Sequence, residues 1–326
     1  MATACGGPAV GVLSKILFAE GASPHTFGAS SERYEILMDG DPAENFQRHG
    51  RLIGGQGITG KIYRIKQRVR KGGYFVFGRM IINPSNGAFS TLLKYLVGTD
   101  AGGGVFTPGN CLNPFGVLKY MDSYTHEFKD GVVSRWILQG SGVSFQERGT
   151  PDLLTLAIDC IFKDDVWNTT SWPASEPGLP TAANYTPYVF QDCSGQVVIE
   201  GAAREIYGFR IDCKNKIKPR WANSFAASSF VYAGKEVSLG LQFPFDANND
   251  DLYEPTTAGA EATLTFDLGA IGSESLYTEF KFTNLRIPER SPYVEDEFDI
   301  KFENEGVAFG DGATEVPEII VTNIDS

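Results

Sequence analysis

Short apolar runs separated by glycine and proline recur along this chain of 326 residues. The sequence holds 37 Gly and 17 Pro, residues that form turns and interrupt helices, so the pattern favours many short strands. Hydrophobic residues make up 42% of the chain and aromatic residues 12%, which is enough apolar material to exclude disorder of the whole chain. The length predicts two domains of roughly 130–160 residues each.

The clearest strand signal runs from Tyr63 to Arg70, where apolar or neutral residues alternate with bases. A period of two is typical of a strand, and this strand has one wholly basic face. That face consists of Arg64, Lys66, Arg68 and Arg70. Gly72-Gly73 predicts a tight hairpin turn, and the residues Tyr74–Ile82, rich in aromatic and branched side chains, predict the return strand.

One helix is predicted after this hairpin. Ser85 or Asn86 can cap its start and Gly98 can end it. Its apolar stripe contains Phe89, Leu92, Leu93, Leu96 and Val97. Further strands are predicted near Leu118–Phe128, Val132–Phe145 and Leu153–Phe162.

The same order of elements recurs after a proline-rich stretch, with Ile206-Tyr207 echoing Ile62-Tyr63. Strands are predicted near Gln196–Cys213, Lys235–Phe245, Ala262–Leu268, Tyr277–Ile287 and Glu297–Phe302, with a short helix beginning at Asp246–Asp251. We therefore predict a mainly β fold of two tandem small β-sandwich or barrel modules, each with a short flanking α-helix. The predicted divisions are an N-terminal arm at 1–55 with one strand near Tyr34–Met38, a first module at 56–166, a linker at 167–187 and a second module at 188–326.

The chain is acidic, with a net charge of −12. Specific nucleic-acid binding is disfavoured, because such a protein gains little affinity from releasing phosphate counterions. From Gln242 onward there are nineteen acids and four bases. This asymmetry suits head-to-tail association of like subunits, and it is equally expected of a solvated acidic face.

Sequence motifs for catalysis, cofactors and metals fail on their context. Gly55, Gly57 and Gly60 have dinucleotide-binding spacing, but a basic strand follows them instead of a helix. The acidic run beginning at Asp246 lacks the glycine that a calcium loop needs. The three histidines form no metal-binding pair, and no nucleophile turn is present. We predict no enzyme activity, cofactor or metal site.

The five cysteines are widely spaced and contain no CxxC pair. They are predicted to be small buried hydrophobes without disulfides, in a reducing compartment. The apolar segment Val10–Ala19 is short and contains Lys15, so it is interpreted as neither a signal peptide nor a membrane span.

The basic face from Arg64 to Arg70 has three interpretations. It can be a solvated face, an ion-pair surface that meets the acidic part of another subunit, or a nucleic-acid contact. The third is weakest, because no aromatic residues interleave on that face to stack bases.

Two stretches carry a resemblance to a known family. One is GQGITGKIYRIKQRVRKGGYFVFGRMIINPSNGAFSTLLKYLVG, and the other runs from GFRIDCKNKIKPRW through GKEVSLGLQFPFDANNDDLYE to VPEIIVTNID. Over about residues 50–326 the chain resembles the two-part tail tube proteins of long-tailed bacteriophages. The basic strand face and the glycine-rich loop at Thr99–Gly116 depart from that pattern.

The resemblance implies a structural, self-assembling subunit whose strands join those of its neighbours into an inner β-barrel. Rings stack into a hollow tube in the virion tail, assembled in the cytoplasm of the host bacterium, and DNA passes through without specific binding. The implied partners are other copies of the chain, the tape measure, terminator and baseplate proteins, and a sheath if the tail contracts; no membrane is implied. The family's channel is usually electronegative, so Asp267 and Glu279 are predicted to line it.

Ring closure by six modules, which the resemblance implies, would need three copies if each chain supplies two modules. A trimeric ring is therefore the favoured prediction and a hexameric ring the alternative. Arg64, Lys66, Arg68 and Arg70 are then predicted to act at one class of subunit interface. The rival functions are another virion component, such as a tail terminator, baseplate hub or capsid decoration protein, and a carbohydrate-binding or hydrolytic β-protein.

Overall fold

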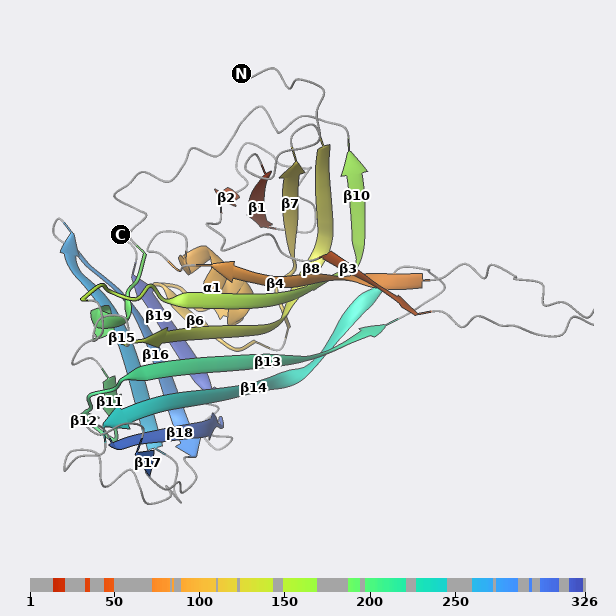
Figure 1. Cartoon of the computed structure of the whole chain (residues 1–326). Helices are drawn as coiled ribbons and strands as arrows, with labels where there is room; N and C mark the ends of the chain where they lie inside the picture. The colour runs from red at the N-terminus through yellow and green to blue at the C-terminus, as the bar shows by residue number, and fades with distance from the viewer. Residues whose placement is uncertain are drawn as a thin grey trace, which may run out of the picture.

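Antiparallel strands make up nearly all of the regular structure in the computed structural model of the chain (Figure 1). The structure describes residues 14–20, 33–35, 44–49, 72–82, 84, 89–109, 111–121, 124–142, 149–168, 187–193, 197–220, 227–244, 260–271, 274–286, 293–294, 300–310 and 317–324. Within them the mainly β fold predicted from the sequence is confirmed. No described helix is long and apolar enough to cross a membrane.

The first layer is a sheet in the order β3-β4-β9-β8-β13-β14-β18-β17. Its strands are β3 (Glu44–His49), β4 (Gly72–Ile82), β9 (Thr155–Phe162), β8 (Tyr124–Ser141), β13 (Gly208–Arg220), β14 (Ser229–Pro244), β18 (Ile300–Ala308) and β17 (Tyr293–Val294). The two halves of the chain meet in this layer, because β8 pairs with β13 from Arg135↔Lys214 to Ser141↔Gly208.

The second layer has the order β12-β11-β15-β16-β19-β6-β5. Its strands are β12 (Ala202–Ala203), β11 (Val197–Ile199), β15 (Ala260–Ile271), β16 (Glu274–Arg286), β19 (Ile319–Ile324), β6 (Val105–Thr107) and β5 (Thr99–Asp100). The two halves meet here as well, since β19 pairs with β6. Figure 1 shows the strands of this layer running across those of the first layer.

A smaller sheet stands above the two layers in Figure 1 and shares β8 with the first layer. Its other strands are β2 (Arg33–Glu35), β1 (Ser14–Glu20), β7 (Phe115–Met121) and β10 (Asp164–Asn168). Strand β8 passes from one sheet to the other near Asp130, whose φ is 48°. A Cβ at the next residue, Gly131, would lie 2.1 Å from the ring of Phe162, so glycine is required there.

Alternating side chains from the two layers form the core. In residues 261–267 of β15 and 276–282 of β16 every second residue is buried and the intervening residues are at least partly exposed. Phe209 of β13 meets Phe266 of β15 with ring centroids 5.1 Å apart, and Phe266 lies 6.2 Å from Phe280 of β16. Buried residues from both halves form one hydrophobic cluster. Within the described residues, then, the two halves share one sandwich, and the division into two modules stays a prediction.

The predicted helix is confirmed as α1 (Phe89–Leu96). Three side chains donate hydrogen bonds to backbone carbonyls at its C-terminal end, where a helix leaves carbonyl acceptors unpaired. The indole Nε1 of Trp136 donates to the Leu96 carbonyl at 2.9 Å. Asn113 donates to the carbonyls of Lys94 and Gly98, and the Lys235 ammonium donates to the Val97 carbonyl. The cation also complements the negative end of the helix dipole.

Two sequence predictions about the N-terminal half need correction. The predicted turn at Gly72-Gly73 is wrong: both glycines lie in β4, where they pair with His49 and Arg48 of β3. The reason is that β3 supplies the antiparallel partner that the hairpin was expected to supply. The expectation of an irregular arm before residue 55 missed β1 and β3 and placed β2 only approximately. The predicted strand Tyr63–Arg70, the caps Ser85 and Asn86 and the second helix near 246–251 lie outside the described residues.

Candidate channel and assembly surfaces

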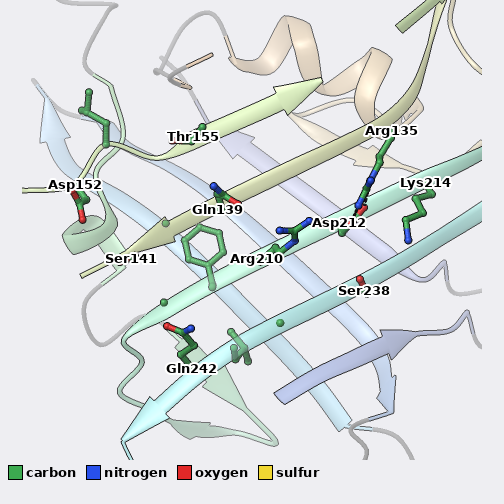
Figure 2. Close-up of a pocket in the computed structure, with 16 residues that line it drawn as sticks. Arg135, Gln139, Ser141, Asp152, Thr155, Arg210, Asp212, Lys214, Ser238 and Gln242 are labelled. Atoms are coloured by element: carbon green, nitrogen blue, oxygen red, sulfur yellow. Dashed lines mark hydrogen bonds and ion pairs between the residues drawn. The ribbon is translucent and has the colours of Figure 1, made fainter. Parts of the chain in front are cut away.

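A concave groove with a volume of about 760 Å³ lies on the outer face of the first layer. Figure 2 shows it running over β8, β13 and β14, with the start of β9 at one side. Small or uncharged polar residues supply much of its lining: Gln139, Ser141, Ser238, Gly240 and Gln242. They reach this face because the alternate positions of the same strands, such as Leu138 and Leu239, are buried in the core.

An ion pair crosses the groove between β8 and β13. The Arg135 guanidinium donates from Nε to Asp212 Oδ1 at 2.9 Å and from a terminal nitrogen to Asp212 Oδ2. A terminal nitrogen of Arg210 lies 3.5 Å from the same Oδ2. Two parallel hydrogen bonds fix the guanidinium plane against the carboxylate. Figure 2 shows the three side chains together on the groove floor.

Burial disfavours ionisation of the Asp212 carboxyl, but the basic side chains around it outweigh the effect of burial. The hydrogen bond from Arg135, with the nearby charges of Lys214 and Arg210, holds the pKa of the Asp212 carboxyl below its usual value. The hydrogen bond to Asp212 correspondingly raises the pKa of Arg135. The groove therefore presents fixed charges of both signs rather than a single-sign field.

The outer face of the second layer carries the two acids predicted to line a channel. Asp267 of β15 is exposed and Glu279 of β16 is partly exposed. Because Thr265 pairs with Glu279 and Asp267 with Tyr277, the two acids are diagonal neighbours on one face. Elsewhere on this face the Lys281 ammonium lies 2.8 Å from a Glu261 carboxylate oxygen. The structure thus brings the two acids together, while their role in a channel stays a prediction.

The sequence analysis did not identify a second basic strand, β13. The strand continues to Arg220, and a base occupies each of its exposed positions. These bases are Arg210, Lys214, Lys216, Lys218 and Arg220. The signal was available as the spacing of lysines after Asp212, but the predicted strand ended too early to include it. The first basic strand, with Arg64, Lys66, Arg68 and Arg70, lies outside the described residues.

The described part of the chain holds no group of three or more side chains that could bind a metal ion. Its described cysteines are Cys111, which is exposed, and Cys160, Cys193 and Cys213, which are buried. Burial in the core raises the pKa of the Cys193 and Cys213 thiols to about 12, so these two behave as small apolar side chains.

The family model described as phage tail tube protein matches residues 54–305. This match covers most of the chain, and the chain belongs to the phage tail tube protein family. Membership identifies a structural subunit of the virion tail, as the resemblance in the sequence implied. No curated protein matches the chain.

Proposed function

We propose that the chain closes into rings that stack as a tail tube, with the groove face of β8, β13 and β14 lining the channel. The observation that carries this proposal is the concave polar face on the layer that contains the longest strands. The inner wall of a closed barrel curves around the barrel axis, so a concave sheet face suits it. DNA would meet glycine, serine and glutamine residues there. It would also meet Arg135, whose positive charge is partly neutralised by Asp212.

The acidic face of β15 and β16 is the rival lining, as predicted from the sequence through Asp267 and Glu279. Like-charge repulsion from phosphates would keep DNA from adhering to it. Its Lys281–Glu261 pair reduces the net negative charge, however, and the concave groove lies on the first layer. We therefore place the acidic face on the outside of the tube.

Ring closure requires sheet edges that can pair with neighbours. The first layer ends in β3 on one side and in β17 and β18 on the other, where β18 also pairs with β16 of the second layer at Val307 and Ala308. We propose that β3 and the remaining part of the β17–β18 edge meet in the ring. Because both halves of the chain contribute to one cluster of buried residues, one chain supplies one module. The resemblance-based count of six modules then favours six copies over the three predicted from duplication.

The remaining partners follow from this role. They are the tape measure inside the tube, the terminator and baseplate proteins at its ends, and a sheath in a contractile tail. DNA passes transiently and without specific binding, and assembly takes place in the host cytoplasm.

Negative-stain microscopy and sedimentation of the purified full chain test the proposal. We expect hollow tubes of constant diameter whose abundance rises above a threshold protein concentration. Single rings that never stack would indicate a terminator, and monomers that bind glycans would indicate a carbohydrate-binding protein; either result would contradict the proposal.

A further inference from the structure

The ends of β13 and β14 form a two-stranded projection, here called the ribbon: residues 216–220 of β13 and 229–234 of β14. On one side β8 pairs with β13 only as far as Lys214, and on the other β18 pairs with β14 only from Val237. In the described chain no third strand pairs with the ribbon. Figure 1 shows β13 and β14 continuing together past the end of β18.

The ribbon is nonetheless built as a regular hairpin. Its strands pair from Ile217↔Tyr232 to Arg220↔Ser229. The backbone N–H and the hydroxyl of Ser228 each donate to the Arg220 carbonyl at 2.9 Å. An isolated two-stranded hairpin is marginally stable in water, so a regular ribbon of this kind suits a surface that gains cover from a partner.

One face of the ribbon is apolar and continues the core side of the sheet. In the body of β13, Ile211 and Cys213 point into the core, and two positions apart along the same strand come Ile217 and Pro219. Across the ribbon their partners are Tyr232 and Phe230. All four of these ribbon residues are partly exposed.

A bulge preserves this apolar face. The register between β13 and β14 shifts by one residue between Asn215 and Ile217. Gly234 lies at the shift with a φ of 119°, a conformation that favours glycine. Without the extra residue, Phe230 and Tyr232 would lie on the opposite side from Ile217. The local geometry therefore keeps four apolar side chains on one side of a ribbon that leaves the core.

The opposite face of the ribbon is basic. Lys216, Lys218 and Arg220 are exposed, and the Glu236 carboxylate lies 3.8 Å from the Lys216 ammonium. The whole chain carries a net charge of −12, and its acids are concentrated after Gln242. A basic ribbon on an acidic body is complementary to another copy of that body.

We infer that the ribbon docks on a second copy of this chain in the adjoining ring, with its apolar face covered and its bases at the rim of the contact. This inference rests on the proposed function and names the partner of one surface of it. Lys235 at the base of the ribbon donates to the Val97 carbonyl of α1, so the docked ribbon would be anchored to the core of its own subunit.

Charge reversal provides the first test. The variant K216E/K218E/R220E is compared with the charge-conserving control K216R/K218R/R220K. The tube-forming wild-type chain is the reference for both. We expect both variants to melt like the wild type as monomers, because the altered residues are exposed. The charge-reversed variant should need at least about tenfold more protein to form tubes at low salt, and the control should assemble normally. Equal thresholds for all three chains would overturn the inference and leave the proposed function intact.

Photo-crosslinking provides the second test. Phe230 is replaced by p-benzoylphenylalanine, which keeps an aromatic side chain at that position, and isotope-labelled and unlabelled chains are mixed before irradiation. Crosslinks between labelled and unlabelled chains in tubes support docking on a second copy, whereas crosslinks within one chain only would overturn it. Retention of duplex DNA by wild-type tubes, lost in K216E/K218E/R220E while assembly is unchanged, would identify a DNA contact and also overturn it. A wild type that forms no tubes would refute the proposed function together with the inference.

Discussion

The sandwich body and the ribbon have the same alternating pattern of side chains but a different fate for their apolar faces. In the body, Phe209 of β13 is buried against Phe266 of the second layer. In the ribbon, Phe230 and Tyr232 remain partly exposed, because the paired sheet around them has ended. Packing within one chain therefore accounts for the buried face of the body, whereas we propose that the apolar face of the ribbon is covered only in the assembly.

The largest predicted effect separates the two regions by mutation. Phe280 is fully buried and its ring contacts those of Phe89 and Phe266, so F280A should lower the free energy of unfolding by about 3–5 kcal/mol. F230A in the ribbon should lower it by less than about 1 kcal/mol. Denaturant unfolding of the monomers measures both values.

In tube formation, unlike in monomer stability, F230A should have the larger effect when only folded chains are compared. Tubes of F230A should form only at raised protein concentration, although its monomer is stable. A monomer destabilised as strongly by F230A as by F280A would mean that the ribbon is part of the core, and the comparison would fail.

An intermediate effect is expected where the body ends, at the Arg135–Asp212 pair. Asp212 is nearly buried and Arg135 is about a third exposed, so D212N should cost about 1–3 kcal/mol at neutral pH. Because the folded-state pKa of Asp212 is lowered, its contribution is present above the unfolded value of about 3.9 and is lost as pH falls through the folded pKa.

Unfolding curves at several pH values check this prediction. The difference between wild type and D212N should shrink below about pH 4. The matched control is D267N on the exposed acidic face, which should change stability by less than about 0.5 kcal/mol at neutral pH. A gap between wild type and D212N that widened in acid would contradict the assignment.

The smallest effect is predicted for the ion pair at the base of the ribbon. Lys216 and Glu236 are about half exposed or more and their charged atoms lie 3.8 Å apart. Such a pair contributes little in water, so E236Q should change the free energy of unfolding by less than about 0.5 kcal/mol. A double-mutant cycle with K216M measures the pair directly. A coupling well above 1 kcal/mol would show that the ribbon is held more rigidly than its exposure indicates.

The sequence predicted those parts of the fold whose signals are local. A run rich in aromatic and branched residues located the strand at Tyr74–Ile82, and an apolar stripe located α1. It could not predict that β8 would pair with β13, because pairing between distant segments depends on tertiary packing. The groove arises from that pairing, so Arg135 and Asp212 were not predicted to meet. The basic face of β13 was missed for a simpler reason, since the expected strand ended at Cys213 instead of Arg220.

The orientation of the subunit in an assembled tube tests the central claim most directly. A cryo-electron microscopy map of tubes made from the full chain would show which outer face points to the axis. We predict six copies per ring, with β8, β13 and β14 lining the channel and the ribbon reaching the adjoining ring. A map with the acidic face of β15 and β16 toward the axis, or with three copies each supplying two separate modules, would contradict the account.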